Sequence, residues 1–163
     1  MGLTQAKDDL PKPQVDVARY LGVWYEIARL PMRFERDLHC VTATYTQNED
    51  GTIKVHNRGT KGSPQGPLEQ ISGKAWSVDA TNSRLKVQFF WPLSADYFIM
   101  KRDDDYKWAI VGQSNREYLW FLSRTPKIDD KLYQEMFEFA KEHGFPVEKL
   151  IKPRHLETLP YEI

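Results

Sequence analysis

The chain has 163 residues and equal numbers of basic and acidic side chains, 23 each, for a formal net charge of zero. This length is typical of one domain with its own core, and the balanced charge excludes a basic field that would hold nucleic acid or anionic lipid. The single cysteine, Cys40, excludes a disulfide within the chain.

The first fifteen residues carry charged side chains, including Lys7, Asp8, Asp9 and Lys12, and no apolar run. The sequence as given therefore predicts neither a signal-peptide core nor a membrane-spanning helix. Two locations follow: the cytoplasm, or another compartment if a leader has been removed. We expect residues 1–15 to form a peripheral arm, 16–152 a single domain and 153–163 a tail.

From residue 23 to residue 124, short segments of alternating apolar and polar residues are separated by turn signals. Asp50-Gly51 is a strong hairpin signal, and the regular spacing is typical of an antiparallel meander. Closed barrels of about eight strands have an interior that can just hold one small ligand. The strands are predicted at 23–30, 41–45, 52–58, 69–77, 84–91, 97–102, 106–112 and 117–124.

The sequence changes character after Pro126. Asp129 or Asp130 can cap a helix, and Gly144 lies where such a helix would end. Apolar residues between them recur at spacings of three and four, which predicts a helix packed outside the barrel. The predicted fold class is all-β: an eight-stranded up-and-down antiparallel β-barrel with one C-terminal α-helix.

The order of the turns assigns the connections to two ends of the barrel. The long loops, at 31–38, 59–68, 91–96 and 113–116, all fall at one end, which we expect to be the open mouth. At the other end we expect the Arg124 guanidinium to stack on the Trp24 indole. The predicted closed-end cluster is Gly22, Trp24, Asp105 and Arg124.

Alternation along each strand predicts which side chains face inward. Small residues at several inward positions favour a cavity, and a core filled by large aromatic side chains is the alternative. Glu26 also falls on the inward face, where it is either paired, at a wet cavity bottom or in contact with a ligand. For the strands at 97–102 and 106–112 the alternation does not decide between the two faces. The predicted ligand-binding residues are Ala28, Phe34, Val41, Ala43, Tyr45, Ile53, Val55, Asn57, Ile71, Gly73, Val87, Phe89, Tyr118 and Trp120.

Three short blocks resemble the conserved blocks of the kernel lipocalins: Gly22-x-Trp24, Asp105-Tyr106 and Arg124. The longer strings at 24–31, 41–45 and 118–126 are similar to the bacterial outer-membrane lipocalin (Blc) and apolipoprotein D-like group, and the similarity spans residues 16–152. The resemblance implies a calyx that binds fatty acids or lysophospholipids for transport, storage or envelope maintenance. It also implies the periplasm or outer membrane, and a homodimer. Bacterial members are commonly lipoproteins held by an N-terminal acylated Cys; this sequence has none there, so the anchor either is absent or belongs to a removed leader.

One branch of lipocalins isomerises lipids with an inward thiol on the second strand. Cys40 is on that strand but out of phase with Val41 and Ala43, so we expect its thiol to point away from the cavity. The four histidines lack metal-ligand spacing, and no Ser–His–acid set or phosphate loop can be assembled. We expect a binding protein with no enzyme activity, metal or cofactor; a thiol-dependent isomerase using Cys40 is the less favoured alternative.

Apolar bulk also falls at the predicted open end, in Phe34 and in the run Phe90-Trp91-Pro92-Leu93. This is more than a loop needs, and it indicates a dimer contact, a surface for peripheral membrane association or a lid over the pocket. An interaction module that uses this patch is therefore the second alternative.

Overall fold

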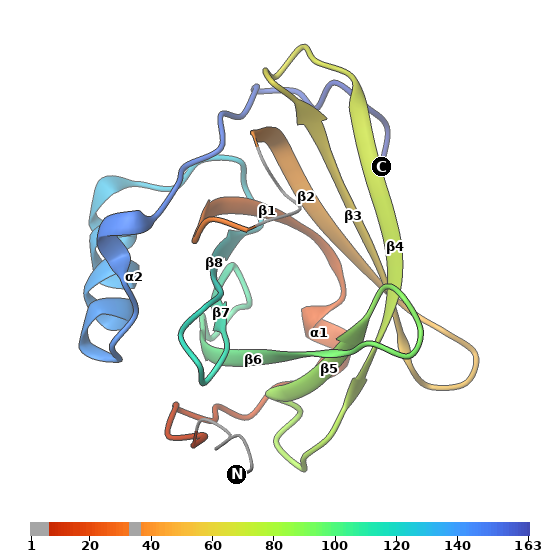
Figure 1. Cartoon of the computed structure of the whole chain (residues 1–163), viewed down its shortest axis with the longest axis vertical. Coiled ribbons are helices and arrows are strands. Elements are labelled where there is room, and N and C mark those ends of the chain that lie inside the picture. Colours follow the sequence, from red (N-terminus) through yellow and green to blue (C-terminus); the bar gives the residue numbers. More distant parts are fainter. Residues whose placement is uncertain (1–6, 33–36) are drawn as a thin grey trace, which may run out of the picture.

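The computed structural model describes residues 7–32 and 37–163. Within these residues eight antiparallel strands follow one another around a closed barrel, and β8 returns to pair with β1 (Figure 1). The strands are β1 (Gly22–Arg29), β2 (Leu38–Gln47), β3 (Ile53–Lys61), β4 (Leu68–Ser77), β5 (Arg84–Gln88), β6 (Ala95–Arg102), β7 (Trp108–Gly112) and β8 (Leu119–Ser123). The helices are α1 (Val17–Tyr20), α2 (Asp130–Glu142) and the 3-10 helix η1 (Val147–Lys149). The predicted fold class is confirmed.

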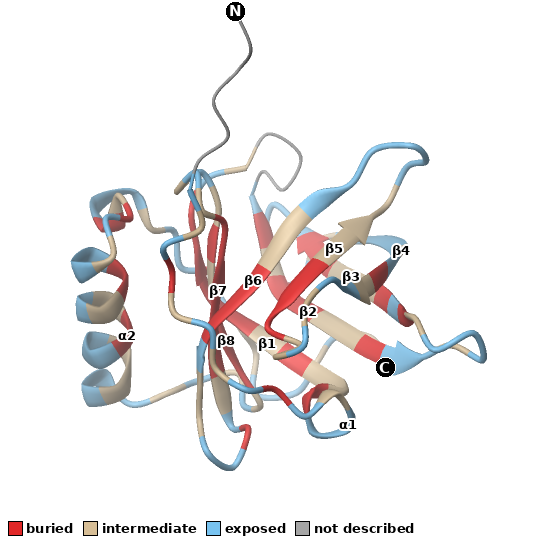
Figure 2. Cartoon of the chain, turned by 90° about the horizontal axis from the view of Figure 1, so that it is seen from below, coloured by how far each residue is buried: buried red, intermediate tan, exposed pale blue. Residues whose placement is uncertain are grey.

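The two ends of the barrel differ in what covers them. The β2–β3, β4–β5 and β6–β7 turns lie at one end together with α1, whose Tyr20 packs against the barrel interior (Figure 2). The four remaining strand connections lie at the opposite end, because neighbouring strands are antiparallel. We call the first the closed end and the second the mouth.

Helix α2 packs on the outside of the barrel, beside β7 and β8 (Figures 1 and 2). It begins at its N-cap Asp129, whose side chain accepts the backbone N–H of Leu132 at 2.7 Å, and Gly144 follows its end with a φ of +83°. Met136 and Ala140 on its inner face are buried against barrel residues such as Phe121. The barrel wall therefore separates two apolar clusters, one inside the barrel and one beneath α2.

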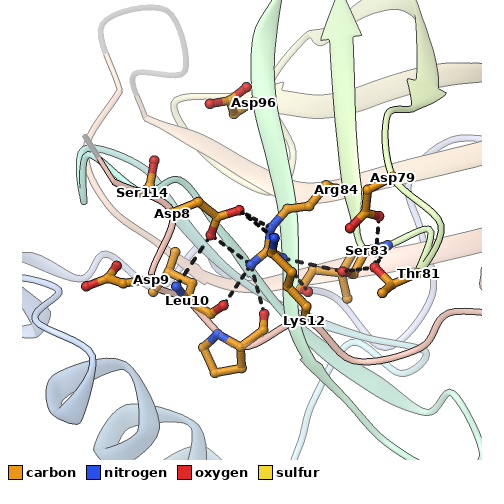
Figure 3. A network of polar contacts seen from close by, with 12 residues as sticks. Asp8, Asp9, Leu10, Lys12, Asp79, Thr81, Ser83, Arg84, Asp96 and Ser114 are labelled. Carbon is orange, nitrogen blue, oxygen red and sulfur yellow. Dashed lines mark hydrogen bonds and ion pairs between the residues drawn. The ribbon is translucent and has the colours of Figure 1, made fainter. Parts of the chain in front are cut away.

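Arg84 of β5 holds the N-terminal arm against the outside of the barrel through hydrogen bonds (Figure 3). The Arg84 guanidinium donates to both carboxylate oxygens of Asp8, at 2.7 and 3.0 Å, and to the carbonyls of Leu10 and Pro11. Leu10 and Val15 are buried. The sequence predicts a peripheral arm, but its described part is packed, because Arg84 supplies a partner that local sequence does not reveal.

The C-terminal tail covers the outer face of β2. The backbone N–H of Cys40 donates to the carbonyl of Arg154 at 2.8 Å, and the Tyr161 hydroxyl donates to the carbonyl of Cys40. Cys40 and Thr42 are fully buried in consequence. None of the helices in the described part of the chain has the length and apolarity needed to cross a membrane.

Candidate ligand cavity

Arg124 seals the closed end of the barrel. Its guanidinium lies 3.7 Å from the centroid of the Trp24 ring, as predicted, and donates to the carbonyls of Val23, Arg19 and Tyr106 at 2.9, 2.9 and 3.0 Å. Burial lowers the pKa of Arg124 from its usual value, but an arginine stays charged at neutral pH. One side chain therefore ties together α1, β1 and the β6–β7 turn.

Gly22 belongs to the same cluster for two reasons. Its φ is +102°, in the region that favours glycine, and a Cβ there would lie 3.3 Å from Nη1 of Arg124. Asp105, the fourth predicted member, is instead exposed on the β6–β7 turn. The residue that meets Arg124 is its neighbour Tyr106, whose hydroxyl also accepts the N–H of Asp16 at 2.8 Å.

The lower half of the barrel, next to the closed end, is filled by side chains. Trp24 is completely buried, and its indole N–H donates to the carbonyl of Tyr20 at 2.8 Å. Three predicted ligand-binding residues, Tyr45, Ile53 and Val55, are buried in this half. The alternative of a core filled by large aromatic side chains therefore describes the lower half of the barrel.

Three tyrosine hydroxyls meet where the filled half ends. The Tyr97 hydroxyl lies 2.7 Å from that of Tyr20 and 2.8 Å from that of Tyr45. Burial raises the pKa of Tyr20 and of Tyr97 well above the usual value, so these phenols stay neutral. Tyr97 is only partly buried as a residue, whereas Tyr20 and Tyr45 are buried. Tyr97 therefore forms a floor.

Beside Tyr97 several inward side chains are only partly buried, although Val41 and Val111 on the same inner face are buried. The Trp120 ring stacks on Tyr97 and on Tyr118, with centroid separations of 6.4 and 5.9 Å, and forms an aromatic wall that rises towards the mouth. Ala43 and Val87 pack against the same interior cluster and are likewise partly exposed. The candidate site is the upper half of the barrel.

A β-bulge in β1 changes the composition of the wall. Glu26 pairs with Leu122, Ala28 with Phe121 and Arg29 with Trp120, so that Ile27 and Ala28 together face one residue of β8. Paired residues share a face of the sheet, which puts Ala28 in the cluster beneath α2. The prediction that Ala28 lines the cavity is therefore wrong, because the extra residue of a bulge breaks strict alternation.

The same bulge turns Arg29 inward, onto the face that Glu26 already shares. Arg29 Nη1 donates to Glu26 Oε2 at 2.8 Å, and the two residues are 1% and 4% exposed. Of the three options open for Glu26, the structure shows the paired one. A buried carboxylate is tolerated when it is paired, and the pair adds no net charge to the wall.

Gly73 does not leave space for a ligand. A Cβ at Gly73 would lie 2.6 Å from Cδ1 of Phe89, so the Phe89 ring occupies the room above it. Strand pairing shows the same neighbourhood, because Lys74 and Ala75 lie beside Gln88 and Val87. Phe89 is thus part of the wall of the upper half.

The other predicted residues divide as follows. Asn57 pairs with Ala43 and with Ile71 at the level of the upper half, and Val41 is buried against Gly59. Phe34 lies outside the described residues. Arg29 and Tyr97 were not predicted: a bulge hides the first, and the ambiguous phase of the sixth strand hides the second. Among the described residues, no group of three His, Cys, Asp or Glu is placed to hold a metal ion.

A barrel sealed at one end, with an aromatic-lined upper half beneath a ring of loops, defines a small-molecule calyx. The family model for a lipocalin-like domain matches residues 15–155. The chain therefore belongs to the lipocalin-like family.

Several relatives span most of the chain. It is 47% identical over 137 residues to the outer membrane lipoprotein Blc of Escherichia coli K12, covering 83% of this chain and 77% of that protein. It is 37% identical to temperature-induced lipocalin-1 of Arabidopsis thaliana, covering 97% and 89%. It is 32% identical to apolipoprotein D of Mus musculus, covering 86% and 79%.

Solved structures share the fold at lower identity. Insecticyanin from Manduca sexta has a TM-score of 0.73 at 18% identity, covering 95% of this chain and 88% of that one. The cockroach allergen Per a 4 has a TM-score of 0.73 at 21% identity, covering 96% and 98%. At these identities the likeness concerns the fold alone.

Proposed function

We propose that the chain binds a fatty acid or a lysophospholipid in the upper half of its barrel and carries or stores it. The supporting observation is a contrast within one interior: Tyr20, Trp24 and Tyr45 towards the closed end are buried, whereas Ala43, Val87 and Trp120 keep exposed surface. Membership of the lipocalin-like family supports a small hydrophobic ligand. The lining is mostly apolar and aromatic, with the Glu26–Arg29 pair and Asn57 as polar exceptions, and suits an acyl chain.

The energetics allow useful affinity. Burying an acyl chain gives about 0.8 kcal/mol per methylene, so some ten methylenes contribute roughly 8 kcal/mol before costs. Lost ligand freedom offsets several kcal/mol of this. The remaining free energy of about 4–5 kcal/mol corresponds to a dissociation constant on the order of 0.1–1 mM.

The location of the protein is a further part of the proposal. Bacterial relatives are named outer membrane lipoproteins, and by this likeness we propose the periplasm or outer membrane. The homodimer implied by the lipocalin resemblance stays a prediction.

A binding protein is favoured over a thiol isomerase by the position of Cys40. Its backbone N–H and carbonyl are bonded to the C-terminal tail, and the residue is completely buried. A completely buried thiol offers a ligand no access to its sulfur.

Native mass spectrometry of the purified protein, followed by organic extraction, tests the proposal. We expect a co-purifying acyl lipid, lost on Ala43→Trp, which fills the upper half, and kept on Ala80→Trp. Ala80 is exposed on the β4–β5 turn at the closed end, so the control makes the same change away from the cavity. A lipid-free wild-type protein whose tryptophan fluorescence ignores added fatty acids would contradict the proposal.

A further inference from the structure

Exposed apolar side chains gather at the mouth. Trp91, Leu93 and Phe90 in the β5–β6 loop are 85%, 73% and 68% exposed, and Leu68 and Ile71 on the mouth half of β4 are 44% and 37% exposed. We call these five residues the rim patch. Folded proteins expose single apolar side chains freely, but a group at one edge marks an interaction surface.

Strand pairing places the start of the β5–β6 loop beside β4. Lys74 of β4 pairs with Gln88 of β5, and Phe89 lies against Gly73. Leu68 and Ile71 stand on opposite faces of β4, so the exposed loop residues Phe90, Trp91 and Leu93 are the main part of the rim patch. The patch is also continuous with the cavity, because Phe89, the neighbour of Phe90, has its ring on Gly73 inside the barrel. An apolar path thus leads from the loop into the upper half.

The charges around the rim patch indicate what kind of surface fits it. Residues 87–95 contain no charged side chain. On the flanking strands Lys86 forms an ion pair with Asp96, and the exposed Lys61 and Glu69 are of opposite sign. The patch and its border are therefore close to neutral.

We propose that the rim patch docks on a lipid bilayer and presents the mouth of the barrel to it. Tryptophan is enriched at membrane–water interfaces, and leucine and phenylalanine insert below it. A neutral patch matches uncharged headgroups and apolar chains. A standard protein–protein interface uses about 20 residues a side, far more than this rim offers. Direct exchange of ligand with the bilayer would rest on the proposed function; docking itself does not.

Co-sedimentation with neutral phosphatidylcholine vesicles tests the docking. We expect the wild-type protein to bind them, with no gain from anionic lipid and no loss at high salt, because the patch lacks charge. The triple variant Phe90→Ser, Trp91→Ser, Leu93→Ser should bind at least tenfold more weakly. The matched control is Val78→Ser, which removes a 51% exposed apolar side chain at the closed end and should leave binding unchanged.

Trp91 provides a direct readout. Its fluorescence should shift to the blue on vesicle addition and be quenched by brominated lipid, and both signals should be missing in Trp91→Phe. Three outcomes would overturn the docking: wild-type protein that stays unbound, a triple variant that binds like the wild type, or a Trp91 shift that follows protein concentration without lipid, as a second copy would produce.

Ligand binding in solution separates this inference from the proposed function. The triple variant should still bind a soluble short-chain fatty acid, because its changes lie on the rim and outside the cavity. A wild-type protein that binds vesicles but no fatty acid would leave docking standing and contradict the carrier function. A triple variant that loses both activities would assign the loop to the ligand site and overturn docking as its role.

Discussion

At the scale of one residue, Arg124 shows how a planar cation can link several segments of the chain. Its guanidinium stacks on Trp24 and serves carbonyls from three separate segments. The ammonium group of a lysine is a point charge, so it can neither stack flat on an indole nor donate in the fixed directions of these three carbonyls.

We expect Arg124→Lys to lower the free energy of unfolding by about 2 kcal/mol, from lost charged hydrogen bonds and cation–π contact. Urea denaturation followed by fluorescence measures this. Arg154→Lys is the control, since Arg154 is exposed and contacts the barrel through its backbone. Equal stability of the two variants would show that the stack and the hydrogen bonds of Arg124 contribute nothing beyond its charge.

Gly73 and Phe89 form a second pair at this scale. A methyl group at Gly73 overlaps the Phe89 ring, and overpacking of this kind costs about 1–3 kcal/mol. We expect Gly73→Ala to lower stability by that amount and to weaken fatty acid binding, because the ring must move into the upper half. Adding Phe89→Leu should recover only part of the loss, because the backbone oxygen of Gln88 would also lie 2.6 Å from the added Cβ. If the double variant is no more stable than Gly73→Ala alone, overlap with the Phe89 ring is not the cause.

At the scale of elements, both terminal segments pack on the outside of the barrel and are held there by specific contacts. The N-terminal arm is held by the Asp8–Arg84 contact, and Arg84 is 3% exposed. Burial by itself would raise the pKa of Asp8, but the hydrogen bond and charge of Arg84 outweigh it and lower the pKa below the usual value. The folded state therefore binds this proton less readily than the unfolded chain, and the contact stabilises the fold above the ordinary Asp pKa.

Asp8→Asn should lower the unfolding free energy by about 1–2 kcal/mol at neutral pH. The difference from wild type should shrink as the pH falls below about 4 and Asp8 of the wild type takes up its proton. Thermal unfolding across a pH series measures it. Asp9→Asn, which changes an exposed carboxylate paired with Arg116, should cost less. A pH-independent difference for Asp8→Asn would contradict the linkage.

The C-terminal tail makes a different prediction, because it seals Cys40. We expect the native wild-type thiol to react slowly with a thiol reagent and at least tenfold faster after Tyr161→Ala, which removes the hydroxyl and ring over β2. Glu157→Ala, an exposed change on the same tail, is the control. Fast labelling of the wild type would show that the tail does not protect the thiol.

At the scale of the whole molecule, the closed end of the barrel is filled core, and we propose that the mouth half holds the ligand. The filled lower half supplies packing for the fold. A site about four strand residues deep would measure about 13 Å. An extended long acyl chain exceeds this depth, so the part beyond it would bend or reach the mouth.

A series of fatty acids of increasing length tests this division. Affinity should rise by about 0.8 kcal/mol per methylene for the short members and level off once the upper half is full. Titration calorimetry or displacement of a fluorescent acyl probe measures it. A constant increment through the longest chains would mean that the lower half opens to admit ligand.

Local chemistry in the sequence was enough to predict the eight strands, the outer helix and the stack of Arg124 on Trp24. Alternation, turn residues and helix caps are short-range signals, and the closed end follows from counting turns. These signals do not report an extra residue in a strand, so Ala28 was assigned to the wrong face and Arg29 was missed.

The tertiary structure alone decided how far the interior is filled. Tyr20 comes from α1, Tyr45 from β2 and Tyr97 from β6, and their hydroxyls meet only because the closed barrel brings them together. The same holds for Asp8 with Arg84 and for Tyr161 with Cys40, which are far apart in the chain. The sequence by itself determined a barrel with a mouth, because the periodicity of strands is a local property. How far the interior is filled, and how both termini pack on the barrel wall, depend on long-range contacts, which no local pattern encodes.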